Sequence, residues 1–357
     1  MKRFAFIIHP LRGKDAVRKY KFLAPFNDAT LEWMMSKMSP SIASEVKGVE
    51  SITGAKTEGI FIGLPYTPRL FLERPLTEVY DKIHQCCEIA EREGCEIIGL
   101  GAFTSVVGDG GITVAERANI AVTSGNSYTV ATAIEGALNA SHAVGIVPAE
   151  STVAIVGATG SIGHTCSTML SREFGKTVLV GRDPDRTAAI AAEIPGSIPT
   201  TELSAIANAD LVLTVTSSDA ALIMPEHLKS GSVVCDVARP RDVSIRVAKE
   251  RPDVLVIEGG VVSVPGNVEF GLNFGFPPKT AYACMSETMI LALEQRLENF
   301  TLGKDVSVSQ VEEIQSLAAK HGFKVAGYRS FEKAVGEREI NFVREARFKR
   351  AVVGNHA

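Results

Sequence analysis

The chain has 357 residues, of which 45% are hydrophobic and 22% are charged, and its formal net charge is −4. This is an ordinary globular composition, without internal repeats or low-complexity segments, so it excludes fibrous and disordered classes. At about 150 residues per domain, the length predicts two domains, each large enough to bury its own core.

Nothing in the chain predicts a targeting or membrane segment. The start, MKRFAFIIHPLRGK, has an apolar run that is too short for a signal peptide and no small-residue cleavage site after it. No apolar stretch reaches the roughly 18 residues that a transmembrane helix needs. The six cysteines form no CxxC pair and show no metal-ligand spacing. We therefore expect a cytoplasmic protein with reduced thiols, no transmembrane segment and no metal site.

Both ends of the chain are basic. Residues 1–21 carry seven Lys or Arg against Asp15 alone, and residues 324–357 carry eight against four Glu. Basic ends on either side of an acidic middle favour docking of an anionic partner, although such charges more commonly just lie on the solvated surface. We expect no nucleic-acid partner.

The first 148 residues are predicted to form an α/β substrate domain. Apolar runs at 3–9, 58–64 and 95–102 are typical of buried strands. Residues 76–94 have apolar positions at helical spacing and end in Gly94. This alternation of strand and helix favours an α/β domain over a helical bundle.

Two loops in this domain are rich in small and hydroxyl residues. They are LGAFTSVVGDGG (100–111) and TSGNSYTVATA (123–133), and each follows a predicted strand. Because ligands in open α/β sheets bind beyond the carboxyl ends of strands, we expect the substrate contacts here.

Residues 149–276 are predicted to form a Rossmann domain. A strand, a glycine turn and a helix occupy 152–175, and strand and helix repeat over 176–194. Further apolar strands are predicted within 209–218, 231–242 and 253–262. Continuous Val, Ile and Leu runs spaced by helices indicate a parallel sheet covered on both faces. The predicted fold is therefore α/β, with an NAD(P)-binding Rossmann domain preceded by a smaller α/β domain.

The last part of the chain is predicted to be helical. A long helix is expected to begin just after Pro277-Pro278, where proline is tolerated. Another is predicted over 307–322. Residues 277–325 would return to the substrate domain, and 326–357 would form a basic tail.

The segment GATGSIG places Gly157, Gly160 and Gly163 in a GxxGxxG turn between strand and helix. In a Rossmann domain these glycines permit the tight turn, the approach of the pyrophosphate and close helix–strand packing. The pyrophosphate is expected over the helix N-terminus, beside the hydroxyls of Thr159 and Ser161. A tight turn without a ligand is the alternative. The other predicted cofactor contacts are Ile162, Thr216, Ser217 and Gly260.

The end of the second strand predicts NADPH rather than NADH. NAD enzymes usually place an acidic residue there to bind the ribose 2′-hydroxyl. Here the strand ends in VGRDPDR, which puts Arg182 at that point and Arg186 nearby. Planar guanidinium groups suit a 2′-phosphate. Asp183 and Asp185 come later, although either could reach the ribose.

Cys284 is the candidate nucleophile. It lies about two turns into the predicted helix, near the expected nicotinamide position, with Lys279 five residues upstream. The helix N-terminus and that ammonium both favour a thiolate, although the dipole effect two turns into a helix is small. Position alone leaves a nucleophile and a buried helix residue equally open. The other cysteines are predicted to be buried apolar residues: Cys86, Cys87, Cys95, Cys166 and Cys235.

Together, LGAFTS, TSGNSYT, VAIVGATGSIG, EGGVV and YACMSETMILALE resemble the motifs of long-chain acyl–acyl-carrier-protein reductases, in the order and spacing of that family. The resemblance implies an N-terminal substrate domain, a Rossmann domain that binds NADPH, and a cysteine nucleophile at the YAC position, which is Cys284. It also implies a fatty acyl thioester of acyl-carrier protein or coenzyme A as substrate. The product would be a fatty aldehyde, released or passed to a downstream enzyme.

The sequence departs from that family in three places. The fifth Rossmann turn reads DVARPRD, where the family is expected to have a glycine-rich stretch. The N-terminal domain diverges more than the core, so an acyl-chain preference does not carry over. The basic tail has no recognised counterpart. The basic stretches 2–21 and 324–350 would suit an acidic acyl-carrier protein.

In the implied mechanism, the Cys284 thiolate attacks the acyl carbonyl, and NADPH then reduces the acyl-enzyme to the aldehyde. Each step creates an oxyanion, and one hydrogen-bond donor to it is worth about 3–4 kcal/mol. The candidate donors are Asn126, Ser127 and Thr129, with Thr104 and Ser105 behind them. Equally, these residues would suit the N-cap of a helix that begins near residue 127.

Three alternatives use the same Rossmann domain. A dehydrogenase of a small polar acid, similar to shikimate dehydrogenase, would need a Lys/Asp pair that has no clear place in the first 150 residues. Glutamyl-tRNA reductase has a turn like DVARPRD, but its nucleophile is N-terminal, and the first 85 residues here contain no cysteine. A non-catalytic NADPH-binding sensor would show no turnover.

Overall fold

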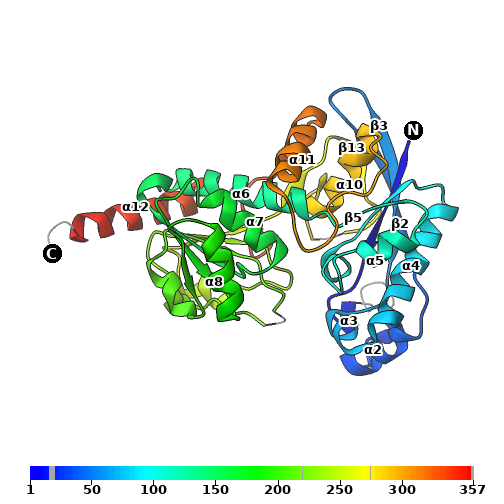
Figure 1. Cartoon of the computed structure of the whole chain (residues 1–357), viewed down its shortest axis with the longest axis horizontal. Coiled ribbons are helices and arrows are strands. Elements are labelled where there is room, and N and C mark those ends of the chain that lie inside the picture. The colour runs from blue at the N-terminus through cyan, green and yellow to red at the C-terminus, as the bar shows by residue number, and fades with distance from the viewer. Residues whose placement is uncertain (16–20, 219, 274, 355–357) are drawn as a thin grey trace. The chain divides into compact units, whose positions relative to one another are not determined.

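A computed structural model describes residues 1–15, 21–218, 220–273 and 275–354. The chain divides into two compact units, and some of their elements are labelled in Figure 1. The first unit comprises residues 1–128, 262–306 and 312–324. The second comprises residues 129–261, 307–311 and the chain from 325 onward. Each unit is built on a six-stranded sheet.

The sheet of the first unit is mixed. Its strands run in the order β13-β2-β3-β1-β4-β5, with β3, β1, β4 and β5 parallel and β2 and β13 antiparallel. The strands are β1 (Arg3–Ile8), β2 (Ser41–Glu50), β3 (Lys56–Gly63), β4 (Ile97–Gly99), β5 (Ala121–Thr123) and β13 (Gly266–Glu269). The helices of this unit are α2 (Asp28–Ser36), α3 (Pro68–Glu73), α4 (Leu76–Arg92), α5 (Ile112–Arg117) and α10 (Ala283–Glu294).

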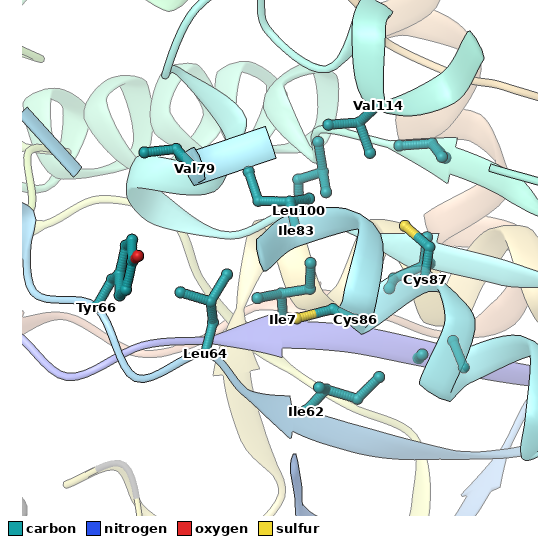
Figure 2. Packing of buried hydrophobic residues seen from close by; sticks show 14 of the residues in the cluster. Ile7, Ile62, Leu64, Tyr66, Val79, Ile83, Cys86, Cys87, Leu100 and Val114 are labelled. Atoms are coloured by element: carbon teal, nitrogen blue, oxygen red, sulfur yellow. The ribbon is translucent and has the colours of Figure 1, made fainter. Parts of the chain in front are cut away.

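One face of this sheet packs against α4 (Figure 2). Ile7 of β1 and Ile62 of β3 lie in one buried cluster with Val79, Ile83 and Cys86 of α4. The three α4 residues recur at helical spacing, so one side of the helix is apolar and covers the sheet. Each such buried side chain contributes about 1.5–3 kcal/mol to folding.

The opposite face packs against α10. A Cβ built on Gly99, the last residue of β4, would lie 2.1 Å from Thr288 Oγ1 and 2.5 Å from the Phe6 ring. Only glycine leaves room for α10 to lie so close to the strand. This contact fixes α10 beside the carboxyl end of β4.

The sheet of the second unit is entirely parallel. Its order is β11-β10-β9-β6-β7-β8, which reverses between β6 and β9 as in dinucleotide-binding folds. The strands are β6 (Thr152–Val156), β7 (Lys176–Val180), β8 (Ile198–Thr200), β9 (Leu211–Thr214), β10 (Val233–Asp236) and β11 (Leu255–Glu258). Its helices include α7 (Ser161–Leu170), α8 (Pro184–Glu193), α9 (Ile245–Glu250) and α12 (Glu337–Gly354). Nearly all side chains of its central strands are buried, so both faces are covered, and the predicted α/β class is confirmed.

The remaining elements connect these structures. They are α6 (Asn126–Ala143), α11 (Val308–His321), β12 (Val261–Ser263), β14 (Thr280–Tyr282), β15 (Lys324–Val325), β16 (Arg329–Ser330) and β17 (Lys333–Ala334). Helix α11 confirms the helix predicted over 307–322. Among the described residues, no helix is both long and apolar enough to cross a membrane.

The predicted helix that begins directly after Pro277-Pro278 is wrong. Lys279 has a φ of +63°, outside the helical region, and Thr280–Tyr282 form strand β14 beside β12. Helix α10 therefore begins only at Ala283 and ends at Glu294. Strand pairing and the left-handed Lys279 delay the start of the helix by about one turn.

The basic tail contains α12, which is bound to the second unit through Asp210. The Asp210 carboxylate accepts hydrogen bonds from Arg347 (2.8 Å), Lys229 (2.8 Å) and Arg350 (3.3 Å). Burial by itself raises the pKa of this carboxyl, but the bonds from Lys229 and Arg347 outweigh it and lower the pKa to about 2. Arg344 also donates to the carbonyl of Ala143 (2.6 Å). These arginines hold the tail in place.

Replacing Asp210 with Asn should lower the free energy of unfolding by about 2 kcal/mol, because three half-buried cations lose their anionic partner. The lowered pKa means that the carboxylate stabilises the protein fully above about pH 4 and progressively less as the pH falls toward 2. Urea unfolding of both proteins at several pH values should therefore show a deficit that shrinks in acid. The control is Glu250→Gln, which breaks the exposed Arg246–Glu250 pair and should leave the free energy of unfolding nearly unchanged. Equal losses in the two variants would contradict the anchoring role.

Candidate functional site

Cys284 is the second residue of α10 and lies in its first turn. The prediction that it sits two turns into a helix is wrong, because the helix begins at Ala283. Its side chain is partly exposed, whereas each of the other five cysteines is buried, as predicted. The partial positive charge of a helix N-terminus is strongest in the first turn, so the actual position favours a thiolate more than the predicted one. Lys279 instead donates to Asn267 Oδ1 (2.9 Å).

The turn between β5 and α6 packs directly against Cys284. Gly125 has a φ of +76°, and a Cβ built there would lie 2.3 Å from the Cβ of Cys284 and 2.4 Å from its Cα. Any other residue at this position would displace the first turn of α10. The SGNSYT motif and the cysteine therefore form one site at the carboxyl end of β5, although Gly125 and Cys284 are 159 positions apart in the chain.

A buried carboxylate completes this arrangement. Glu287 is fully buried and accepts hydrogen bonds from Ser127 Oγ (2.7 Å), the Tyr128 N–H (2.8 Å) and Thr123 Oγ1. Burial raises the pKa of Glu287 above its usual value, and the bonds from these groups oppose that rise. Sequence reasoning missed this residue, because a glutamate in an apolar helix has no partner until the fold brings one. The feature of the sequence that could have identified Glu287 is its position three residues after Cys284.

The predicted oxyanion donors fall into two groups. Asn126 is buried at the first position of α6, and Thr129 is partly buried one turn later. Ser127 donates its hydroxyl hydrogen to Glu287. Helix α6 is thus capped at the Tyr128 N–H by a carboxylate from α10. Thr104 and Ser105 donate to the carbonyls of their own short helical turn (2.8 and 2.7 Å).

His9 is a half-buried group at the end of β1 in the first sheet. It directly follows β1, and its Nε2 accepts a hydrogen bond from the Phe103 N–H (3.2 Å). The ring also makes edge contacts with Phe71 and Phe103. Burial lowers the pKa of His9 to about 4, so the ring is neutral at physiological pH. His9 is therefore an uncharged neighbour of Phe71 and Phe103.

The glycine turn of the second unit has the shape of a phosphate cradle. Gly157 has a φ of +88°, and a Cβ on Gly163 would lie 2.1 Å from the Gly157 carbonyl oxygen. A Cβ on Gly160 would meet only the Gly157 oxygen, at 3.4 Å, so this side of the turn is open. The φ of Gly157 and the close contact at Gly163 are what a tight turn and close packing require, and the approach of a pyrophosphate at Gly160 stays a prediction.

The start of α7 holds donors suited to an anion. Gly160 caps the helix without a side-chain hydrogen bond, and the buried Ser161 Oγ has no partner in the described part of the chain. Thr159 and Ile162 flank it and are partly exposed. A dinucleotide pyrophosphate would satisfy the helix N–H groups and this hydroxyl. The residues present therefore fit a nicotinamide dinucleotide.

The end of β7 presents arginine. Arg182 and Arg186 are exposed, and Arg186 reaches back to the Thr159 carbonyl oxygen (3.3 Å). Asp183 caps α8 by accepting from the N–H groups of Asp185 (3.0 Å) and Arg186 (3.1 Å). Its carboxylate is thereby directed to the helix.

The other predicted cofactor contacts differ in their surroundings. Thr216 binds Asp242 through its N–H (2.9 Å) and its hydroxyl (2.5 Å), which holds the loop after β9 in place. Ser217 is exposed, and Gly260 is buried with a φ of +75°. Among the described residues, no group of His, Cys, Asp and Glu is arranged to hold a metal ion.

The family model for shikimate / quinate 5-dehydrogenase matches residues 140–258 of this chain. An aminotransferase, PigE of Serratia sp., is 32% identical over 366 residues, covering 96% of this chain and 42% of PigE. The chain therefore spans about two fifths of that relative's length. The long-chain acyl-[acyl-carrier-protein] reductase of Synechococcus elongatus is 27% identical over 330 residues, covering 88% of this chain and 95% of the reductase.

Solved structures show distant likeness. Glutamyl-tRNA reductase from Methanopyrus kandleri is 19% identical over 79% of this chain and 61% of its own, with a TM-score of 0.31. The malic enzyme of Entamoeba histolytica is 13% identical over 99% of this chain and 76% of its own, with a TM-score of 0.45. The second unit is an NAD(P)-binding domain of the oxidoreductase type.

Gly125→Ala should lower the free energy of unfolding by about 2–4 kcal/mol, because the methyl group needs both a strained positive φ and a shift of α10. The matched control is Gly94→Ala. Gly94 has a φ of +71° with nothing within 4 Å of the new Cβ, so its cost should be only the about 1–2 kcal/mol of backbone strain. Chemical denaturation of both variants measures the difference. Equal losses would show that Gly125 is not packed against Cys284.

Proposed function

We propose that the protein reduces a long-chain fatty acyl thioester, carried on acyl-carrier protein or coenzyme A, to the fatty aldehyde with NADPH. The observation that supports this most directly is the partly exposed Cys284 at the start of α10, against the SGNSYT turn. The similarity to the Synechococcus reductase, which extends over both units, adds to it. The shikimate / quinate dehydrogenase match ends at residue 258 and leaves Cys284 outside.

In the first half of the proposed reaction, the Cys284 thiolate attacks the carbonyl carbon of the acyl thioester. A bond forms between Sγ and that carbon, and the bond to the carrier sulfur breaks, so the carrier leaves as a thiolate. The entering and leaving groups have similar basicity, so this exchange needs no strong general acid. The helix N-terminus at Cys284 stabilises the attacking thiolate.

In the second half, the acyl group on Cys284 is reduced by two electrons. NADPH, held at the glycine turn 157–163 and by Arg182, would supply these electrons as a hydride to the acyl carbon. The resulting alkoxide re-forms its carbonyl, the bond from carbon to Sγ breaks, and the products are the aldehyde and the Cys284 thiolate. The residues of this chain hold the acyl group and stabilise the oxyanion of each half-reaction.

Asn126 and Thr129 are our candidates for binding the oxyanion. A hydroxyl has a single hydrogen, and Ser127 gives it to Glu287. Ser127 therefore acts through the carboxylate and not as a direct donor. A donor at Asn126 would be worth about 3–4 kcal/mol of transition-state stabilisation.

We assign substrate binding to the first unit and the cofactor to the second. The tail arginines Arg344, Arg347 and Arg350 already bind carbonyls and Asp210, which weakens the tail as a surface for acyl-carrier protein. The N-terminal stretch 2–21 remains the better candidate, and its residues 16–20 lie outside the described part of the chain. The six reduced thiols fit a cytoplasmic reaction.

The test is aldehyde formation. Purified protein is mixed with NADPH and either palmitoyl-acyl-carrier protein or palmitoyl-coenzyme A, and the extract is analysed by gas chromatography with mass spectrometry. We expect palmitaldehyde in amounts equal to the NADPH consumed, and none with Cys284→Ala. Aldehyde formed by Cys284→Ala at the wild-type rate would exclude the acyl-enzyme route, and NADPH binding without turnover on either carrier would favour a sensor.

Arg182→Glu should invert the cofactor preference, because a carboxylate repels a 2′-phosphate and binds a ribose 2′-hydroxyl. We expect the ratio of kcat/KM for NADPH to that for NADH to fall at least about 100-fold, which corresponds to about 2.7 kcal/mol. The control is Arg172→Glu, an equal charge change after α7 and away from the end of β7. An unchanged ratio of kcat/KM for the two cofactors in Arg182→Glu would contradict the NADPH assignment.

A further inference from the structure

Glu287 lies one helical turn beyond the proposed nucleophile. It is three residues after Cys284 in α10, and this spacing puts two residues on the same side of a helix. Its carboxylate is fully buried. Burying a carboxylate is costly unless its oxygens are well hydrogen-bonded, so its presence here needs a reason beyond helix formation.

Three of the hydrogen-bond donors to Glu287 come from one short segment, residues 123–128. Thr123 Oγ1 binds one carboxylate oxygen, and Ser127 Oγ (2.7 Å) and the Tyr128 N–H (2.8 Å) bind the other. Between these points of attachment lies Gly125, the residue that packs on Cys284. Helix α10 therefore carries the thiol and also binds the segment that the thiol contacts.

A further hydroxyl, that of Thr301, binds Ser127 and so supports the bond between Ser127 and Glu287. Thr301 Oγ1 donates to Ser127 Oγ (2.8 Å), and the Thr301 carbonyl oxygen accepts from the Ser124 N–H (3.1 Å). Each hydrogen along the path from Thr301 through Ser127 points toward Glu287. The donors are thus oriented for an acceptor that does not donate in return.

We propose that Glu287 is a positioning residue, whose carboxylate holds the 123–128 segment against Cys284 and so sets the orientation of the thiol and of Asn126. Its role in turnover rests on the proposed function. Its effect on the thiol itself does not, because the contacts exist without any substrate.

Glu294 provides a matched comparison within the same helix. It is the last residue of α10 and binds Lys320 (2.7 Å) and His321 (2.8 Å), away from the 123–128 segment. If Glu287 only stabilised α10, removing either carboxylate would have similar consequences for Cys284. If Glu287 positions the segment, only its own replacement will change the chemistry of the thiol.

The experiment measures alkylation of Cys284 by iodoacetamide, followed by mass spectrometry of the intact protein, in wild type, Glu287→Gln and Glu294→Gln. Because the other five cysteines are buried, the first addition reports Cys284. Glutamine keeps one acceptor oxygen but places an NH₂ group against a donating hydroxyl. We expect Glu287→Gln to change the alkylation rate at least about fivefold and to lower kcat about 10–100-fold with KM nearly unchanged, while Glu294→Gln matches wild type.

The outcomes separate this proposal from the proposed function. Altered alkylation in Glu287→Gln, in a protein whose wild type reduces no thioester, would support positioning and refute the reductase. Wild-type alkylation and kcat in a folded Glu287→Gln would overturn positioning and leave the reductase standing. If Glu287→Gln does not fold, Thr301→Val decides, since it removes only the supporting hydroxyl. A changed alkylation rate in Thr301→Val supports the proposal, and an unchanged rate overturns it.

Discussion

The first unit depends on a single buried carboxylate that joins two helix N-termini. Glu287 in α10 caps α6 at the Tyr128 N–H, and the segment between them places Gly125 on Cys284. A buried anion tolerates few alternative arrangements, because each lost donor costs about 1–3 kcal/mol. The geometry of the site is therefore set by the hydrogen bonds to this carboxylate. The apolar packing of α10 on the sheet supplies the stability that offsets the cost of burying it.

The second unit presents a different kind of site, at its glycine turn and the start of α7. Its glycine turn ends at Gly160, which caps α7 without a side-chain hydrogen bond, and the Ser161 hydroxyl has no partner among the described residues. Leaving a buried polar group unpaired is costly unless a ligand satisfies it. At the site in the first unit, Glu287 is satisfied by hydrogen bonds from that unit and Cys284 is partly exposed, whereas in the second unit the Ser161 hydroxyl has no partner among the described residues. The two sites would suit the proposed reaction, in which the first unit holds an acyl group and the second binds a dinucleotide.

Local patterns in the sequence were sufficient for the Rossmann sheet, because continuous apolar strands and the glycine turn are local signals. They were insufficient at Lys279, whose positive φ and the pairing of β14 depend on tertiary contacts and moved Cys284 into the first turn of α10. Glu287 was missed for the same reason, since its donors lie about 160 positions away in the chain. The tail, predicted only as basic, uses its arginines to bind Asp210.

The most direct test of the account is the mass of the intact protein after mixing with palmitoyl-coenzyme A or palmitoyl-acyl-carrier protein in the absence of NADPH. The account predicts a gain equal to one palmitoyl group on Cys284, absent in Cys284→Ser and discharged when NADPH is added. No adduct with either carrier, in a sample that binds NADPH and whose Cys284 reacts with iodoacetamide, would contradict an acyl-enzyme mechanism.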